Sequence, residues 1–166
     1  MSRKALTVIA IAALAGCAYG MPPSLRHPLA GARAPAIGQI EASAGPAAVG
    51  IPGAGEVKVT VVDFWASWCP GCQESLPQLD ALYRDKQTAG LRVVGVSVDE
   101  RASDAYAVAA SLRTSFPVVV DDGRLASSYS VAQVPLTFVI DAAGTVRWVG
   151  RDPEAVRAAA LAVLAE

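Results

Sequence analysis

The sequence predicts an α/β domain in which a central mixed sheet is flanked by helices. Two continuous apolar runs, residues 57–64 and 91–98, are typical of buried parallel strands. Residues 136–140 and 145–149 carry the pattern of an antiparallel hairpin, with a glycine in the segment that joins them. Helical periodicity separates these regions. Parallel strands joined through helices, next to a hairpin, make a mixed sheet.

Each helix is predicted from the spacing of apolar residues or from a capping residue. After the first strand, apolar side chains recur at helical spacing, at Leu76, Leu79, Leu82 and Tyr83. A second helical stretch lies near residues 103–112. After the hairpin, Asp152 can cap a last helix that has Pro153 at its first position. The expected order is strand, helix, strand, helix, hairpin, helix.

The amino terminus carries the pattern of a bacterial lipoprotein signal. Arg3 and Lys4 precede an apolar stretch that is too short to span a bilayer, because a spanning helix needs about 20 apolar residues. Leu14-Ala15-Gly16-Cys17 resembles the lipobox, in which cleavage precedes a lipid-modified cysteine. We therefore expect Cys17 to carry lipid and to attach the protein to a membrane. The alternatives are an ordinary cleaved signal peptide and an uncleaved anchor.

Residues 17–33 are predicted to form a flexible tether. They contain several prolines and glycines and show no periodicity typical of a packed element. His27, the only histidine of the chain, falls in this segment and is interpreted as a solvated linker residue. The predicted organisation is a signal peptide at 1–16, a lipidated cysteine and tether at 17–33, and one domain at 34–166. That last length is enough for one core and too short for two.

The segment Trp68-Cys69-Pro70-Gly71-Cys72 carries the most chemical information. Two thiols separated by two residues can close a disulfide and open it again, so the pair stores two electrons. A strand before Cys69 and a helix after it place this cysteine at a helix N-terminus. There, unpaired amides and the helix dipole stabilise an anion and lower the pKa of the thiol. Cys69 is therefore the expected nucleophile, and Cys72 the resolving cysteine.

Two motifs resemble those of the thioredoxin superfamily. Residues 62–72 look like its active-site segment, and Pro77 matches the proline of its first active-site helix. Residues 134–141 resemble the segment that carries its cis-proline, here Pro135. The stretch between these motifs, up to residue 121, is similar to the insert of the TlpA/ResA-like branch. The resemblance implies a thioredoxin-like fold with a TlpA/ResA-type central insert.

The same resemblance implies a function. Members of this branch are membrane-tethered reductants outside the cytoplasm, so a thiol-disulfide oxidoreductase in the periplasm or cell envelope is expected. Its partners would be protein thiols and disulfides, as in cytochrome c maturation, and a CcdA- or DsbD-like membrane thiol protein that recharges it. No cofactor beyond the Cys69–Cys72 disulfide and no metal is implied. The alternatives are a disulfide donor and a non-catalytic binding module with the same fold, although the two intact cysteines argue against the module.

The resemblance also assigns roles to residues around the thiols. Asp63 matches a buried carboxylate that relays a proton to the resolving cysteine; the alternative is a solvated acid at the strand end. In the family, the cis bond before Pro135 presents the backbone of Val134 to an incoming peptide. Further residues expected in the substrate groove are Trp68, Pro70 and Gly71. Glu100 matches an acidic residue near the thiols, or is a solvated residue at a helix start.

Composition and spacing exclude several other functions. The chain has 14 Lys and Arg against 15 Asp and Glu and no basic run, so nothing in it attracts nucleic acid. A zinc site would need ligands beyond a single C-x-x-C pair and one histidine. Haem attachment would need histidine where Gln73 stands. Peroxiredoxin chemistry would call for threonine or serine at Ala66, three residues before the reactive cysteine.

Overall fold

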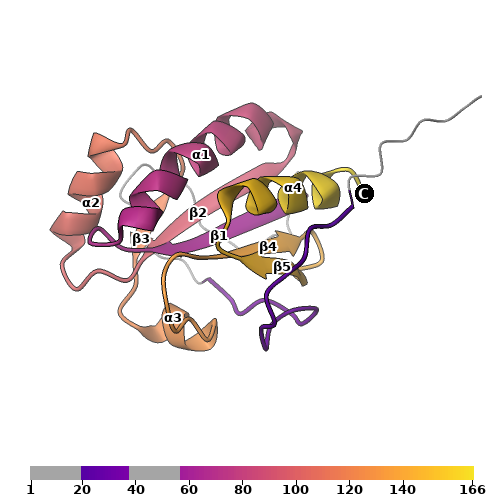
Figure 1. Cartoon of the computed structure of the whole chain (residues 1–166), viewed down its shortest axis with the longest axis horizontal. Coiled ribbons are helices and arrows are strands. Elements are labelled where there is room, and N and C mark those ends of the chain that lie inside the picture. Colours follow the sequence, from indigo (N-terminus) through magenta and orange to yellow (C-terminus); the bar gives the residue numbers. More distant parts are fainter. Residues whose placement is uncertain (1–19, 38–56) are drawn as a thin grey trace, which may run out of the picture.

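A five-stranded mixed sheet lies at the centre of the protein, in the order β3-β2-β1-β4-β5 (Figure 1). The computed structural model describes residues 20–37 and 57–166. The strands are β1 at Val59–Trp65, β2 at Leu91–Ser97, β3 at Val118–Val120, β4 at Leu136–Asp141 and β5 at Val146–Gly150. β1 pairs in parallel with β2 and antiparallel with β4, and β4 forms the expected hairpin with β5. The predicted mixed sheet is confirmed.

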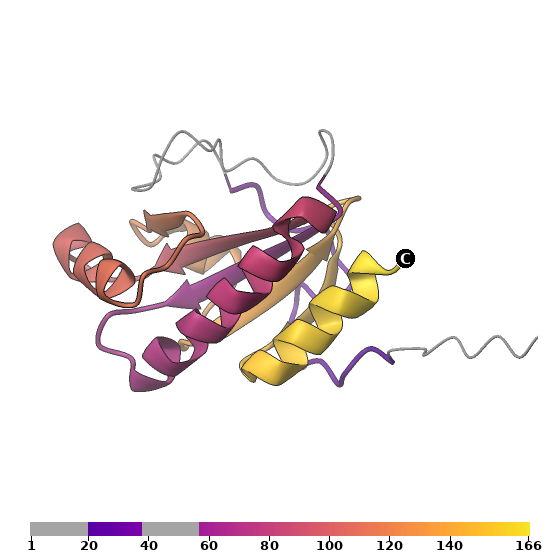
Figure 2. The same cartoon turned by 90° about the horizontal axis from the view of Figure 1, so that it is seen from above.

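Helices cover both faces of this sheet. They are α1 at Pro70–Lys86, α2 at Ala102–Ser111, α3 at Arg124–Ser128 and α4 at Pro153–Leu164, with a 3-10 turn at Gln87–Ala89. Figure 2 shows α1 and α4 side by side over one face. On the opposite face, Leu125 of α3 packs into the core together with Ala34 and Ile37. The order of helices α1, α2 and α4 agrees with the sequence, whereas α3 and β3 are additional elements.

The start of α4 follows its predicted signals. The Asp152 carboxylate accepts a hydrogen bond from the Ala155 amide at 2.8 Å, and Pro153 occupies the first turn, where its missing amide costs nothing. Val156 and Val163 are buried against the sheet. The predicted cap is confirmed.

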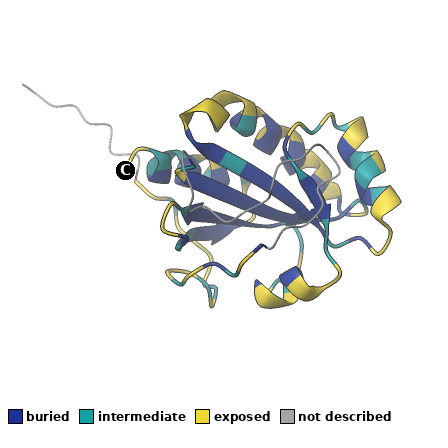
Figure 3. Cartoon of the chain, turned by 180° about the vertical axis from the view of Figure 1, so that it is seen from behind, coloured by how far each residue is buried: buried dark blue, intermediate teal, exposed yellow. Residues whose placement is uncertain are grey.

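Buried side chains form two clusters, one on each face of the sheet, and the strands are almost wholly buried (Figure 3). Successive side chains of a strand point to opposite faces. Along β1, Val61 and Trp65 therefore face α1 and α4, while Val62 and Phe64 face α3. Asp63 belongs to the first series. Its side chain consequently points to the face covered by the helix that carries the cysteines.

The prediction of a flexible tether is wrong for residues 20–33. This segment runs along β5, where the Leu25 amide donates to the Val149 carbonyl at 2.7 Å. The Trp148 indole also donates to the Pro23 carbonyl at 3.0 Å. β5 is an edge strand, so the segment supplies partners that its outer side would otherwise lack. The segment lacks periodicity because its backbone, rather than a regular set of side chains, makes these contacts.

His27 takes part in the same packing, so the interpretation as a solvated linker residue is also wrong. Its ring lies edge-on against Phe138, with the ring centroids 5.0 Å apart. Its Nδ1 accepts a hydrogen bond from the Leu29 amide at 3.2 Å. The imidazole helps fix the turn that follows it and has no contact that indicates chemistry.

The predicted signal peptide and Cys17 lie outside the described residues. Within residues 20–37 and 57–166, no helix combines the length and the apolar character needed to cross a membrane.

Candidate active site

The two cysteines stand where β1 gives way to α1. β1 ends at Trp65 and α1 begins at Pro70, with Cys69 as the N-cap residue in an extended conformation. The Cys69 sulfur accepts a hydrogen bond from the Cys72 amide at 3.2 Å. A helix N-terminus offers unpaired amides and the positive end of the dipole, so this position stabilises a thiolate.

Cys69 and Cys72 form a disulfide across the first turn of α1, with their Cα atoms 5.2 Å apart. The two residues differ in accessibility: Cys69 is 7% exposed and Cys72 is 0% exposed. A mixed disulfide with a partner forms at the sulfur that the partner can reach. The asymmetry favours Cys69 as the nucleophile, as the sequence predicts.

Asp63 is fully buried in the centre of the sheet. Its Oδ1 accepts a hydrogen bond from the Thr137 hydroxyl at 2.7 Å, and its Oδ2 has no partner among the described residues. Burial raises the pKa of Asp63 from 3.8 to about 7, while the Thr137 hydrogen bond lowers it in part. The alternative of a solvated acid is therefore wrong. A carboxyl group with this pKa can accept and release a proton at neutral pH.

The Val134–Pro135 peptide bond is cis. Pro135 stands directly before β4, and the first residue of β4 pairs with Phe64 near the end of β1. The antiparallel register therefore brings the cis-proline and the cysteines to the same end of the sheet. The Arg151 guanidinium donates to the Pro135 carbonyl at 2.9 Å, a contact that the sequence does not indicate.

Exposed residues surround the disulfide. The Trp68 side chain is 68% exposed, and Pro70 and Gly71 are exposed as well. Trp68 lines a recess of about 410 Å³ together with Val98, Asp99, Glu100, Arg101 and Asp104. Glu100 is exposed at this recess, so the structure brings it to the side of Trp68. Whether it acts on the thiols stays a prediction.

Asp99, the neighbour of Glu100, is a site residue that sequence reasoning missed. It is 4% exposed and accepts hydrogen bonds from the Ser67 amide at 2.9 Å and the Ser67 hydroxyl at 2.7 Å. Ser67 stands two residues before Cys69. Two adjacent acids after an apolar strand carry no signal that tells which one turns inward, so the sequence could not have identified it.

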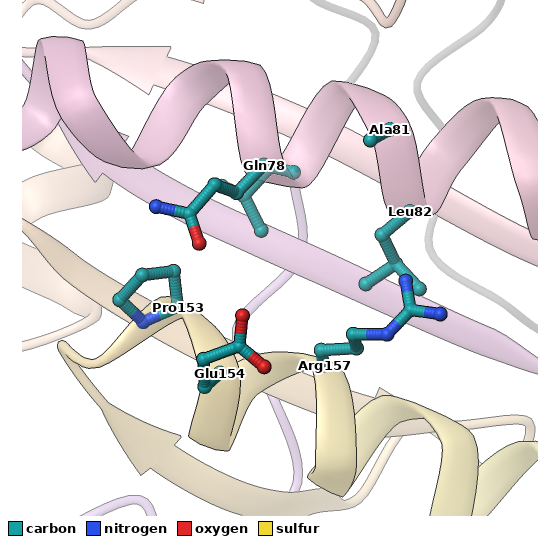
Figure 4. A pocket seen from close by; sticks show the side chains of 7 residues that line it. Gln78, Ala81, Leu82, Pro153, Glu154 and Arg157 are labelled. Carbon is teal, nitrogen blue, oxygen red and sulfur yellow. The ribbon is translucent and has the colours of Figure 1, made fainter.

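A second recess, of about 260 Å³, lies between α1 and α4 (Figure 4). It is lined by Gln78, Leu79, Ala81, Leu82, Pro153, Glu154 and Arg157. None of these residues belongs to the C-x-x-C segment or to the cis-proline segment, so this recess is separate from the disulfide. In the described ranges, no group of three or more His, Cys, Asp or Glu side chains could hold a metal ion.

Comparison with known proteins identifies relatives of this chain. The AhpC/TSA family model matches residues 49–149. The thiol-disulfide oxidoreductase ResA of Geobacillus thermodenitrificans is 31% identical over 91 residues, which cover 54% of this chain and 52% of that protein. The ResA protein of Bacillus subtilis is 31% identical over 90 residues, or 50% of its length. The chain thus spans about half the length of the curated relatives it matches.

Solved structures agree with this relationship. A putative thiol:disulfide interchange protein DsbE from Chlorobium tepidum has a TM-score of 0.62 at 28% identity, covering 79% of this chain and 99% of that chain. The thioredoxin domain of a thiol-disulfide oxidoreductase from Bacteroides vulgatus has a TM-score of 0.66 at 23% identity, covering 81% and 94%. The thioredoxin-like fold inferred from the motifs is confirmed. The TlpA/ResA-type insert stays a prediction.

Replacing Asp63 with asparagine tests the consequence of its buried carboxyl group for stability. The pKa of Asp63 is about 7 in the folded state and 3.8 in the unfolded state, so the folded state holds the proton more tightly. The carboxyl group therefore adds to the stability of the fold below pH 3.8, and this stability is lost as the pH rises from 3.8 to about 7. Asp63→Asn should therefore be more stable than the wild type at pH 8, by about 4 kcal/mol. Urea denaturation across this pH range measures the difference.

The difference in the free energy of unfolding between Asp63→Asn and the wild type should disappear below about pH 4, where the carboxyl group is protonated in both the folded and the unfolded state. Glu74→Gln, which changes an exposed acid of α1, is the matched control and should give no comparable gap. Equal stability of the wild type and Asp63→Asn at pH 8 would contradict the effect of burial.

Proposed function

The chain belongs to the AhpC/TSA family, and we propose that it acts as a thiol-disulfide oxidoreductase through Cys69 and Cys72. The observation that carries the proposal is the disulfide in the first turn of α1, in which Cys69 is 7% exposed and Cys72 is 0% exposed. The names of the curated ResA relatives and of the DsbE-like structure support the same activity.

In the reducing direction, the reaction begins with the dithiol form. The Cys69 thiolate attacks one sulfur of a substrate disulfide, which forms a mixed disulfide and releases the other substrate sulfur as a thiolate. Cys72 then loses its proton to Asp63 and attacks the Cys69 sulfur. The second substrate sulfur leaves as a thiolate, both substrate thiolates take up protons from solvent, and the protein keeps the Cys69–Cys72 disulfide. Two electrons pass to the substrate, and Asp63 returns its proton to solvent.

We propose that the pair works as a reductant. In strongly oxidising members of the superfamily, histidine between the cysteines stabilises the thiolate and with it the reduced form. Here Pro70 and Gly71 supply no cation, and the Asp63 carboxylate opposes a nearby thiolate. Both features weaken the stabilisation of the reduced form. A disulfide donor remains the alternative.

Membership of the AhpC/TSA family does not by itself imply peroxide chemistry for this chain. Ala66 stands three residues before Cys69, at the place where a peroxiredoxin would carry threonine or serine. Its methyl side chain is buried and can neither donate nor accept a hydrogen bond. Peroxide reduction is therefore disfavoured as the principal activity.

We further propose an extracytoplasmic location, with lipid on Cys17 as the anchor and protein thiols and disulfides, such as those of cytochrome c maturation, as substrates. A CcdA- or DsbD-like membrane thiol protein would supply electrons. Since the contacts of the amino-terminal segment with β5 begin at Pro23, six Cα–Cα steps separate Cys17 from the packed part of the domain. They reach at most about 23 Å, so the domain would be held near the membrane surface.

A trapping experiment tests the proposed activity and the roles of the cysteines. Cys72→Ser should accumulate a mixed disulfide with substrate proteins, because its Cys69 attacks and cannot be resolved. Cys69→Ser should accumulate none, because Cys72 is enclosed. Non-reducing gels with and without dithiothreitol measure the adducts. Equal trapping by the two variants would refute the assignment of roles.

The proposed anchor is tested by metabolic labelling. The wild-type chain expressed in a bacterial host should incorporate radiolabelled palmitate, and Cys17→Ser should incorporate none. Cys72→Ser serves as a control that removes a different cysteine and should be labelled like the wild type. Palmitate on Cys17→Ser would show that the lipid, if any, is attached elsewhere.

A further inference from the structure

Ser67 lies in the segment between β1 and Cys69, and each of its polar groups is hydrogen-bonded. Its amide donates to Asp99 Oδ2 at 2.9 Å and its hydroxyl donates to Asp99 Oδ1 at 2.7 Å. Its carbonyl accepts from Gln73 Nε2 at 2.6 Å. Gln73 belongs to the first turn of α1, so Ser67 connects Asp99 on one side with the helix that carries the cysteines on the other.

Asp99 is in turn fixed to the sheet. The Ser97 hydroxyl donates to Asp99 Oδ2 at 2.6 Å, and the Asp99 amide donates to the Ser97 hydroxyl at 3.0 Å. Ser97 is the last residue of β2 and is fully buried. The carboxylate thus accepts three hydrogen bonds and is itself 4% exposed. A buried carboxylate with this many donors is held in one position.

The geometry of Cys69 depends on this connection. Ala66, Ser67 and Trp68 are the only residues between β1 and the N-cap cysteine. A sulfur attacks a disulfide efficiently when it is held in line with the bond that breaks, and a displacement of about 1 Å can cost on the order of 100-fold in rate. Without Asp99, the Ser67 amide and hydroxyl lose their acceptor, and the segment before Cys69 loses its attachment to β2.

We propose that Asp99 is a positioning residue for thiol-disulfide exchange, which holds Cys69 in place for attack through its two hydrogen bonds to Ser67. The inference rests on the proposed function of the cysteine pair. It assigns a role to an acid that neither the motif resemblance nor the position of Glu100 indicated.

Asp80 provides a matched control. Its carboxylate is also buried, at 3% exposure, and also accepts hydrogen bonds from both the amide and the hydroxyl of one serine, Ser115. It forms an ion pair with Arg84 at 3.0 Å as well. Asp80 lies in the middle of α1 and ties this helix to the segment before β3, away from the C-x-x-C turn. Removing the Asp80 carboxylate deletes two hydrogen bonds to a serine, as removing Asp99 does, but leaves the contacts of Ser67 unchanged.

The test compares the rate at which the reduced full chain reacts with oxidised glutathione, at a temperature where every variant is folded by circular dichroism. Asp99→Ala should react about tenfold more slowly than the wild type, or slower still. Asp99→Asn keeps an acceptor for the Ser67 amide, so its rate constant should lie within about threefold of the wild-type value. Asp80→Ala should lower Tm while its rate constant stays within about twofold of the wild type.

If Asp99→Ala does not fold, Ser67→Ala, which deletes one of the two hydrogen bonds, takes its place and should be slowed by about threefold. A wild-type rate for the folded Asp99 or Ser67 variant, or an equal slowing in Asp80→Ala, would overturn the positioning role and leave the proposed function intact. A wild-type chain that exchanges no disulfide with glutathione would overturn the proposed function and the inference with it.

Discussion

The site depends on one constraint: Cys69 must stand where β1 ends and α1 begins. At that point its sulfur accepts a hydrogen bond from the Cys72 amide at 3.2 Å and lies at the positive end of the helix dipole. The parallel pairing of β1 with β2 and the antiparallel pairing with β4 then bring Asp99 and Pro135 to the same end of the sheet. The arrangement therefore follows from where one strand stops, and the neighbouring strands supply the groups around it.

A second property is the cost of placing a carboxyl group in the core. Asp63 has one oxygen bonded to Thr137 and a second without a partner in the described part of the chain. Burial away from water disfavours the charged form and raises the pKa of Asp63 to about 7, and the Thr137 hydrogen bond offsets this only in part. Burial of this carboxyl group lowers the stability of the fold at neutral pH, and it gives the group a pKa at which it can take up and release a proton. Loss of stability at a site of this kind is typical where chemistry requires it.

The sequence could predict those parts of the structure that repeat or that carry local signals. β1, β2 and α1 follow from apolar patterns, and α4 follows from the Asp152 cap. The packing of residues 20–33 has no signature in the sequence, because backbone hydrogen bonds to an edge strand require no side-chain pattern. α3 has five residues and β3 has three, too few to show a period. The burial of Asp99 beside the exposed Glu100 depends on how the chain turns after β2, which spacing along the sequence cannot reveal.

The central claim is that the Cys69–Cys72 pair is a reducing dithiol, and its reduction potential tests this claim most directly. Titration of the purified protein in glutathione or dithiothreitol buffers, followed by thiol alkylation, gives the potential. The lack of a cation between the cysteines and the presence of Asp63 predict a value near the roughly −270 mV of thioredoxin. A value more oxidising than about −180 mV, toward the roughly −120 mV of DsbA, would contradict the claim and identify the protein as a disulfide donor.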